Sequence, residues 1–271
     1  MPRITTARRV LDRFNAADGA LLAAGVAYNT VLALIPIGLV ASGVAGLVFS
    51  DAQSRADLVR SIAAFLPPLA GVVDEIVGGL AKASPSLSLV GLVLAAWGTS
   101  RLFASLESAI AQMDAGAQRR SLVRRTARRI GSIAVLAGIV LAAIVVTPAL
   151  ALALEMNGAG PARPLLDALL ALLPPILGAV ALAAVYKLVP LTRATWRAIA
   201  APTLVGAVML VVLTRVFVFV APRVFGANLV YGTLGAILVS LTWLDLVFTI
   251  VLLGAAWVRE RATSGLEAAV A

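Results

Sequence analysis

Apolar residues along the chain gather in six runs, separated by shorter segments that carry charges, prolines or glycines. A helix needs about 20 apolar residues to cross the hydrocarbon core of a bilayer, and each run approaches or exceeds that length. The pattern therefore predicts an all-α polytopic membrane protein with a single integral membrane domain over residues 1–271. The six predicted spans cover about residues 19–49, 86–110, 130–154, 164–186, 198–221 and 231–258.

The segment between the first two spans, residues 51–85, is too polar to cross a membrane. Apolar residues nevertheless recur along it at helical spacing: Leu69, Val72, Val73, Ile76, Val77 and Leu80. This periodicity predicts an amphipathic helix that lies at the periplasmic interface. Two interpretations stay open: the helix is a cap packed on the bundle, or it is a gate over a pathway.

The composition supports a membrane protein and narrows the chemistry. Hydrophobic residues make up 61% of the chain and charged residues 13%, whereas soluble domains hold about 45–50% and about 25%. The chain contains no cysteine and no histidine, which excludes disulfides, thiolate chemistry, histidine general-base catalysis and the usual zinc sites. We therefore expect no catalytic residue, no metal and no cofactor, and we predict that the protein is not an enzyme.

The net charge of +9 raises the question of nucleic-acid binding, but the positions of the arginines argue against it. Of the 22 basic residues, fifteen fall on one side of the predicted membrane, five on the other and two inside spans. The richer side is expected to be cytoplasmic, so both termini are predicted to lie in the cytoplasm. No nucleic-acid partner is expected.

Six arginines in the connection between the second and third spans form a basic stripe: Arg119, Arg120, Arg124, Arg125, Arg128 and Arg129. Their pairs recur every four to five residues, so they are expected to contact anionic lipid headgroups. Membrane lipids are thus the predicted partners. The sequence leaves open whether the chain also forms a homo-oligomer.

Charged residues inside spans are candidates for function, because each costs at least about 2.5–3.5 kcal/mol to insert. Arg101 and Asp245 both lie about 21–23 Å from the outer ends of their spans, so they are placed to pair. Two interpretations stay open: a structural ion pair, or a substrate or ion site in which Arg101 holds an anion and Asp245 gates or exchanges it. Neighbouring residues included in that candidate pathway are Trp97, Thr99 and Ser100.

Arg215 is a further candidate for the pathway. It lies roughly two turns from the outer end of the fifth span, so its long side chain is also able to reach the headgroups. The sequence does not decide between these two roles.

Three segments resemble a known family: Ala23-Ala24-Gly25-Val26-Ala27-Tyr28 leading to Pro36, Trp97 with Arg101, and Asn228 to Gly235 ahead of Trp243 and Gly254. In this order they resemble the YihY/BrkB family of bacterial inner-membrane proteins, once labelled ribonuclease BN. The resemblance implies a multi-pass protein of the bacterial inner membrane, with a role in transport or in the envelope and no settled activity. This chain departs from the family pattern at Asn29, where an aromatic residue is usual, and near Asp245, while Glu260 matches an acidic position.

The old nuclease label does not fit these residues, because phosphodiester hydrolysis normally requires clustered carboxylates with metals, or histidines. The acidic residues here are scattered over the spans and over both sides of the membrane. The leading hypothesis is a transporter or lipid translocase for an anionic or amphipathic substrate. The alternative is a scaffold that organises envelope machinery without transport.

Overall fold

The structure of the protein is a computed structural model, and it describes residues 2–48, 85–113, 163–189, 194–225 and 232–270. These residues form helices and contain no strand, which confirms the all-α prediction for this part of the chain. The helices are α1 (Pro2–Ala16), α2 (Gly19–Val48), α5 (Pro85–Met113), α7 (Arg163–Leu188), α8 (Trp196–Phe225) and α9 (Gly232–Val270).

Five of the predicted spans coincide with helices α2, α5, α7, α8 and α9. The predicted span at 130–154, the arginines at 119–129 and the amphipathic segment up to residue 84 lie outside the described residues. Helix α9 continues to Val270, well past the predicted end of the last span at residue 258. Helix α1 was not predicted, because its apolar positions form no run long enough to draw attention.

Three stretches are long and apolar enough to cross a membrane: Ala171–Leu188, Trp196–Val220 and Ile237–Thr263. Helices α1 and α2 provide a fourth if they count as one span with a bend of 63°. Several membrane-spanning helices are therefore confirmed. The number six stays a prediction.

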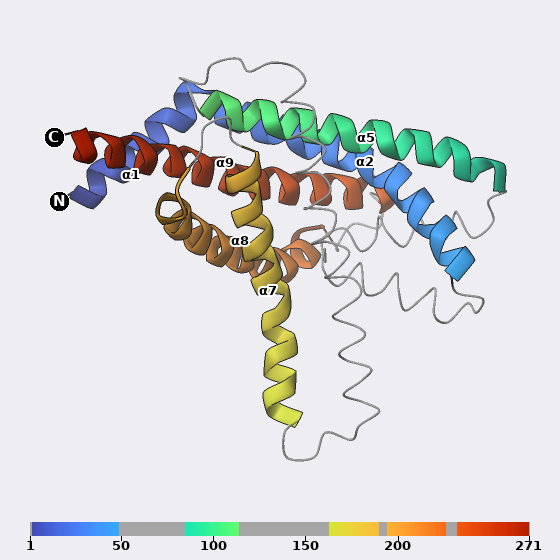
Figure 1. The fold of residues 1–271 in the computed structure, drawn as a ribbon. Helices are drawn as coiled ribbons and strands as arrows, with labels where there is room; N and C mark the ends of the chain where they lie inside the picture. Colours follow the sequence, from blue (N-terminus) through green and yellow to red (C-terminus); the bar gives the residue numbers. More distant parts are fainter. Residues whose placement is uncertain (1, 49–84, 114–162, 190–193, 226–231, 271) are drawn as a thin grey trace.

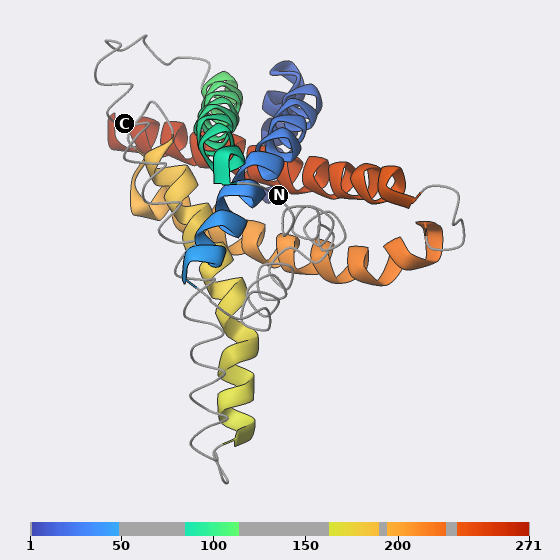
Figure 2. The ribbon, with the colours of Figure 1, turned by 90° about the vertical axis from the view of Figure 1, so that its right-hand side faces the viewer.

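The helices form a bundle in which α9 has the central position (Figure 1). Helix α2 packs along α5, and the two run antiparallel, while α9 packs against α2 on one side and α8 on another. Helix α7 crosses α8, and its first half extends away from the other described helices in both views (Figures 1 and 2). The N- and C-terminal ends lie at the same end of the bundle, where α1 packs against α9.

The central helix α9 is more buried than the outer helices. In the candidate span of α9, 39% of residues are buried, compared with 6% in that of α8. Large apolar side chains on the outer helices are exposed, among them Leu172 and Ile176 on α7 and Val208 and Val212 on α8. Exposed apolar surface on this scale is expected where lipid is the solvent.

The core joins α2, α5, α7 and α9 through close contacts between small and large residues. Ala23 and Ala256 are fully buried, and such small residues allow helices to approach closely. Tyr186 of α7 donates a hydrogen bond from its buried hydroxyl to the carbonyl of Val251 on α9, at 3.1 Å. A side chain at Gly254 would overlap that hydroxyl, so the glycine is needed for this contact.

A tight turn at Asp18 joins α1 to α2. Asp18 has a φ of 51°, in the left-handed region that aspartate tolerates better than most residues. The turn directs Phe14 back against Gly19, where no larger residue fits. Helix α1 therefore folds over the end of the bundle instead of continuing along α2.

Candidate functional site

Arg101, the cation predicted inside the second span, is held by the side chain of Asn29 on the neighbouring helix. The Nε of Arg101, on α5, donates a hydrogen bond of 3.0 Å to the Oδ1 of Asn29, on α2. The Nδ2 of Asn29 in turn donates to the carbonyl of Gly25 at 2.8 Å. Because the amide donor is occupied within its own helix, the amide oxygen is left to face the guanidinium.

This anchoring uses only one of the five N–H groups of Arg101. Its two terminal nitrogens make no hydrogen bond to any other described residue, and Arg101 is exposed. The guanidinium carbon also lies 5.4 Å from the centre of the Trp97 ring, within the range of a cation–π contact. The site thus contains a positioned cation with free donors, beside an exposed aromatic ring.

Arg101 and Asp245 form no ion pair within the part of the chain that the structure describes, so the pairing expected from their equal depth is not present. Depth alone does not fix the direction of a side chain around its helix, and Arg101 lies at the contact with α2. Asp245 lies on α9, partly buried, and makes no hydrogen bond to another described residue. Its neighbours Trp243 and Leu244 pack with Ala27 of α2.

The other residues predicted to line the pathway do not all lie beside Arg101. Trp97 lies beside Arg101, one helical turn away. Thr99 is partly buried and, at two residues from Arg101, faces a different side of α5. Ser100 is exposed, and Arg215 is exposed on α8 with no hydrogen bond to another described residue. The site is therefore Arg101 with Asn29 and Trp97, with Asp245 near α2 on another helix.

Sequence reasoning missed Asn29 as a partner, although it had singled out this position as a departure from the family pattern. The useful signal was an amide in the middle of a long apolar run. A polar group at that depth needs a hydrogen-bond partner, and a charged residue in a neighbouring span is the natural one.

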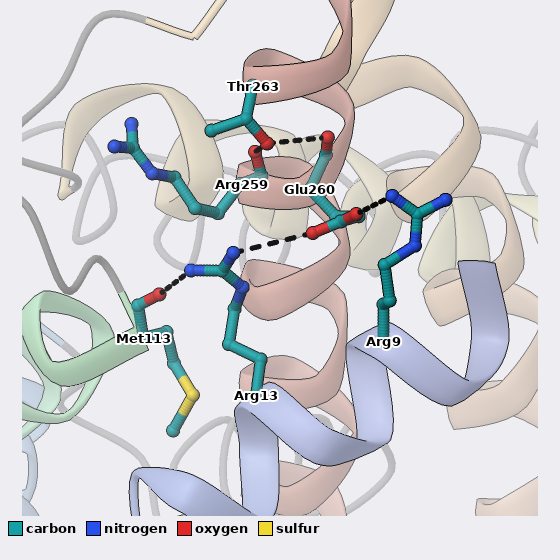
Figure 3. Close-up of polar contacts among 6 residues, drawn as sticks. All are labelled: Arg9, Arg13, Met113, Arg259, Glu260 and Thr263. Carbon is teal, nitrogen blue, oxygen red and sulfur yellow. Dashed lines mark hydrogen bonds and ion pairs between the residues drawn. The ribbon is translucent and has the colours of Figure 1, made fainter. Parts of the chain in front are cut away.

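A second charged cluster lies where α1, α5 and α9 meet (Figure 3). The carboxylate of Glu260 lies 2.9 Å from Nη1 of Arg9 and 3.4 Å from Nη2 of Arg13. Arg13 also donates to the carbonyl of Met113, at 3.5 Å. Met113 is the last described residue of α5.

This cluster connects the first and last helices of the chain to the end of α5. Glu260 is only 8% exposed, so its charge depends on the two arginines for compensation. Thr263 adds local support by donating to the carbonyl of Glu260 at 2.9 Å. The geometry is that of a structural clamp, and it keeps both terminal helices at one end of the bundle.

The comparisons with known proteins agree with the sequence resemblance. A family model described as Virulence factor BrkB matches residues 10–269, which include Asn29, Arg101 and Glu260. No curated protein and no solved structure matches the chain. The chain is an integral membrane protein that belongs to the virulence factor BrkB family.

Proposed function

We propose that this protein is a transporter or lipid translocase of the bacterial inner membrane, and that Arg101 binds the anionic group of its substrate. The observation that carries the proposal is the anchored guanidinium, whose terminal nitrogens have no partner among the described residues. A structural arginine inside a span would be expected to have an acidic partner, because an uncompensated charge is costly there.

The depth of Arg101 supports this role. Asn29 lies ten residues into α2, or about 15 Å along the helix axis. Arg101 lies nine residues before residue 110, the expected inner end of its span, or about 14 Å. Because Asn29 holds the Nε at this level, the side chain is restrained from extending to the headgroups as a free arginine would.

Asp245 provides a second charge, of opposite sign, inside α9. It has no hydrogen bond within the described ranges and is only partly buried. In the proposed mechanism Arg101 attracts the anion and Asp245 repels it, so that the substrate does not remain bound. Binding that is too tight would stop transport at an intermediate step.

The alternative function is a membrane scaffold without transport. The Glu260 clamp favours it, because it fixes α1, α5 and α9 together at one end of the bundle. The two functions differ in what they require of Arg101. A scaffold uses the arginine only for stability, whereas a transporter needs its charge.

The test is the flux of lipids and anionic solutes in proteoliposomes. It compares the wild type with Arg101→Ala, Asp245→Asn and the double variant, after each is shown to insert and fold. Arg223→Ala is the matched control, because Arg223 is exposed near the end of α8 and donates to the carbonyl of Phe219 in its own helix. We expect protein-dependent flux that Arg101→Ala abolishes and Arg223→Ala preserves. Absence of flux across the whole panel, with unstable variants at residue 101, would favour the scaffold.

A further inference from the structure

On the side of α5 that carries Arg101, the exposed side chains that precede it in the helix are large and apolar at three positions. Val93 is 68% exposed, Leu94 44% and Trp97 54%. Together with Arg101 these positions fall within one third of the helix circumference, at 100° per residue. Gly98 is buried, so the part of α5 next to these positions faces the other helices. Three apolar side chains and one cation thus share an open face.

The adjoining surface of α2 extends this face. Leu21 and Tyr28 are exposed, and Gly25 between them leaves the backbone accessible. Asn29 lies at the boundary between the two helices and fixes the position of the cation. The combined surface is mainly apolar and carries the anchored guanidinium of Arg101.

The order of these residues along the membrane normal indicates how a lipid would be oriented on this face. Helix α5 runs from the predicted periplasmic side to the predicted cytoplasmic side, so Val93, Leu94 and Trp97 all lie on the periplasmic side of Arg101. Beyond Arg101, toward the cytoplasm, Ser108 is exposed on the same side. A phospholipid of the cytoplasmic leaflet has the same polarity, with its acyl chains toward the centre and its phosphate toward the cytoplasm.

We infer that this face binds an anionic phospholipid of the cytoplasmic leaflet, with the phosphate at the terminal nitrogens of Arg101 and an acyl chain along Trp97, Leu94 and Val93. The inference rests on the proposed function and names its substrate class. The planar fork of a guanidinium matches two phosphate oxygens at once. The lipid enters sideways from the bilayer, and its phosphate is drawn below the headgroup level, as an early step of translocation requires.

Comparison with Arg215 shows how the bond to Asn29 distinguishes Arg101 from a freely extended arginine. Arg215 is also exposed among apolar residues of α8, yet no other described side chain positions its guanidinium. Its side chain is free to extend to the headgroups, where any anionic lipid is bound weakly. At Arg101 the bond to Asn29 fixes the guanidinium at a defined depth beside an aromatic ring.

The binding test uses the full chain in lipid nanodiscs and the fluorescence of Trp97. Phosphatidylglycerol or phosphatidylcholine with brominated acyl chains is added at equal mole fraction, and the Trp97 signal is obtained by subtracting Trp97→Phe. Loss of a charged hydrogen bond changes affinity by about tenfold. We expect quenching that is about tenfold more sensitive to phosphatidylglycerol, and Arg101→Gln should remove this preference. Arg101→Lys, which keeps the charge but not the fork, should retain part of it.

Asn29→Ala is a second route to the same answer if Arg101→Gln fails to fold. It leaves the cation in place and removes its anchor, so the preference should decrease. Equal quenching by the two lipids in the wild type would overturn the inference. So would displacement of the lipid by excess inorganic phosphate, because the site would then be one for a free anion.

The outcomes separate this inference from the proposed function. A lipid preference that depends on Arg101, without any flux, would retain the lipid site and reject transport. Flux that depends on Arg101, without a lipid preference, would retain transport and reject the phospholipid as substrate.

Discussion

Glu260 and Arg13, which are 247 positions apart in the chain, form an ion pair with 3.4 Å between Oε2 and Nη2. Arg13 also donates to the carbonyl of Met113 on α5, so a single side chain connects α1 to two other helices. The Nε of Arg13 is buried and has no partner in the described part of the chain. This side chain therefore depends strongly on the carboxylate it faces.

The first prediction is that Glu260→Gln destabilises the protein by about 1–3 kcal/mol, because it leaves a partly buried guanidinium without a compensating charge. Thermal unfolding in detergent, followed by tryptophan fluorescence, measures the effect. Arg9→Gln is the matched variant, since the Arg9 side chain is 58% exposed and its pair should contribute less than about 1 kcal/mol. Equal losses in the two variants would mean that the exposed pair with Arg9 accounts for the whole effect and that the pair with Arg13 adds nothing.

The second prediction concerns the contact between Tyr186 and Gly254. Gly254→Ala should destabilise the protein by about 1–3 kcal/mol, because the added methyl group overlaps the tyrosine hydroxyl. Tyr186→Phe should cost about 0.5–1.5 kcal/mol through the lost hydrogen bond to Val251. Unfolding of the double variant should show a smaller cost of Gly254→Ala once the hydroxyl is gone.

Gly178→Ala is the control for this pair, because nothing lies near the position that its added carbon would occupy. Alanine is a better helix former than glycine, so this variant should be neutral or stabilising by up to about 1 kcal/mol. If Gly254→Ala behaved in the same way, the close approach of α7 and α9 would be wrong.

The lengths of the apolar runs located the helices well. The starts of α2, α5, α7, α8 and α9 fall within two residues of the predicted span starts, because the run that must face lipid is also the run that forms the helix. The end of α9 was missed since this helix continues past the last long apolar run into a segment that carries charges. Helix α1 was missed because it is held by charges and by Phe14 rather than by a long apolar run.

The site was only partly predictable, for a reason of geometry. Counting residues gave the depths of Arg101 and Asp245 but not their directions around α5 and α9. The partner of Arg101 is set by the packing of α5 on α2, which a single sequence does not reveal. Likewise, the count of basic residues placed Arg9 and Arg13 on the cytoplasmic side, but their pairing with Glu260 depends on the turn at Asp18.

The third prediction is that both ends of the chain face the cytoplasm. The clamp at Glu260 places α1 beside the end of α9, so Arg8 and Arg261 should share one side of the membrane. The chain contains no cysteine, so Arg8→Cys, Arg261→Cys and Arg223→Cys each introduce a single thiol. A membrane-impermeant maleimide should label position 223 in intact spheroplasts, and positions 8 and 261 only after permeabilisation.

The reverse labelling pattern would invert the orientation without disturbing the clamp. Labelling of positions 8 and 261 from opposite sides would contradict the clamp itself. The experiment thus tests the charge-based orientation and the packing of α1 separately.

The fourth prediction concerns Asp245, a carboxylate inside a membrane-spanning stretch with no hydrogen bond to another described residue. Asp245→Asn keeps the shape of the side chain and removes a charge that is costly in this setting. The unfolding temperature should therefore stay the same or rise by about 2–4 °C per kcal/mol gained. If Asp245 helps to release the substrate, flux should fall even though the protein is at least as stable.

The combination of these two measurements is what identifies a functional residue. A purely structural aspartate would lose stability on substitution, and any loss of flux would then follow from unfolding. Leu246→Ala is a suitable control, because Leu246 is the exposed neighbour of Asp245 on α9 and its truncation should change neither quantity much. Unchanged flux in a stabilised Asp245→Asn variant would remove Asp245 from the pathway and leave Arg101 as its charged residue.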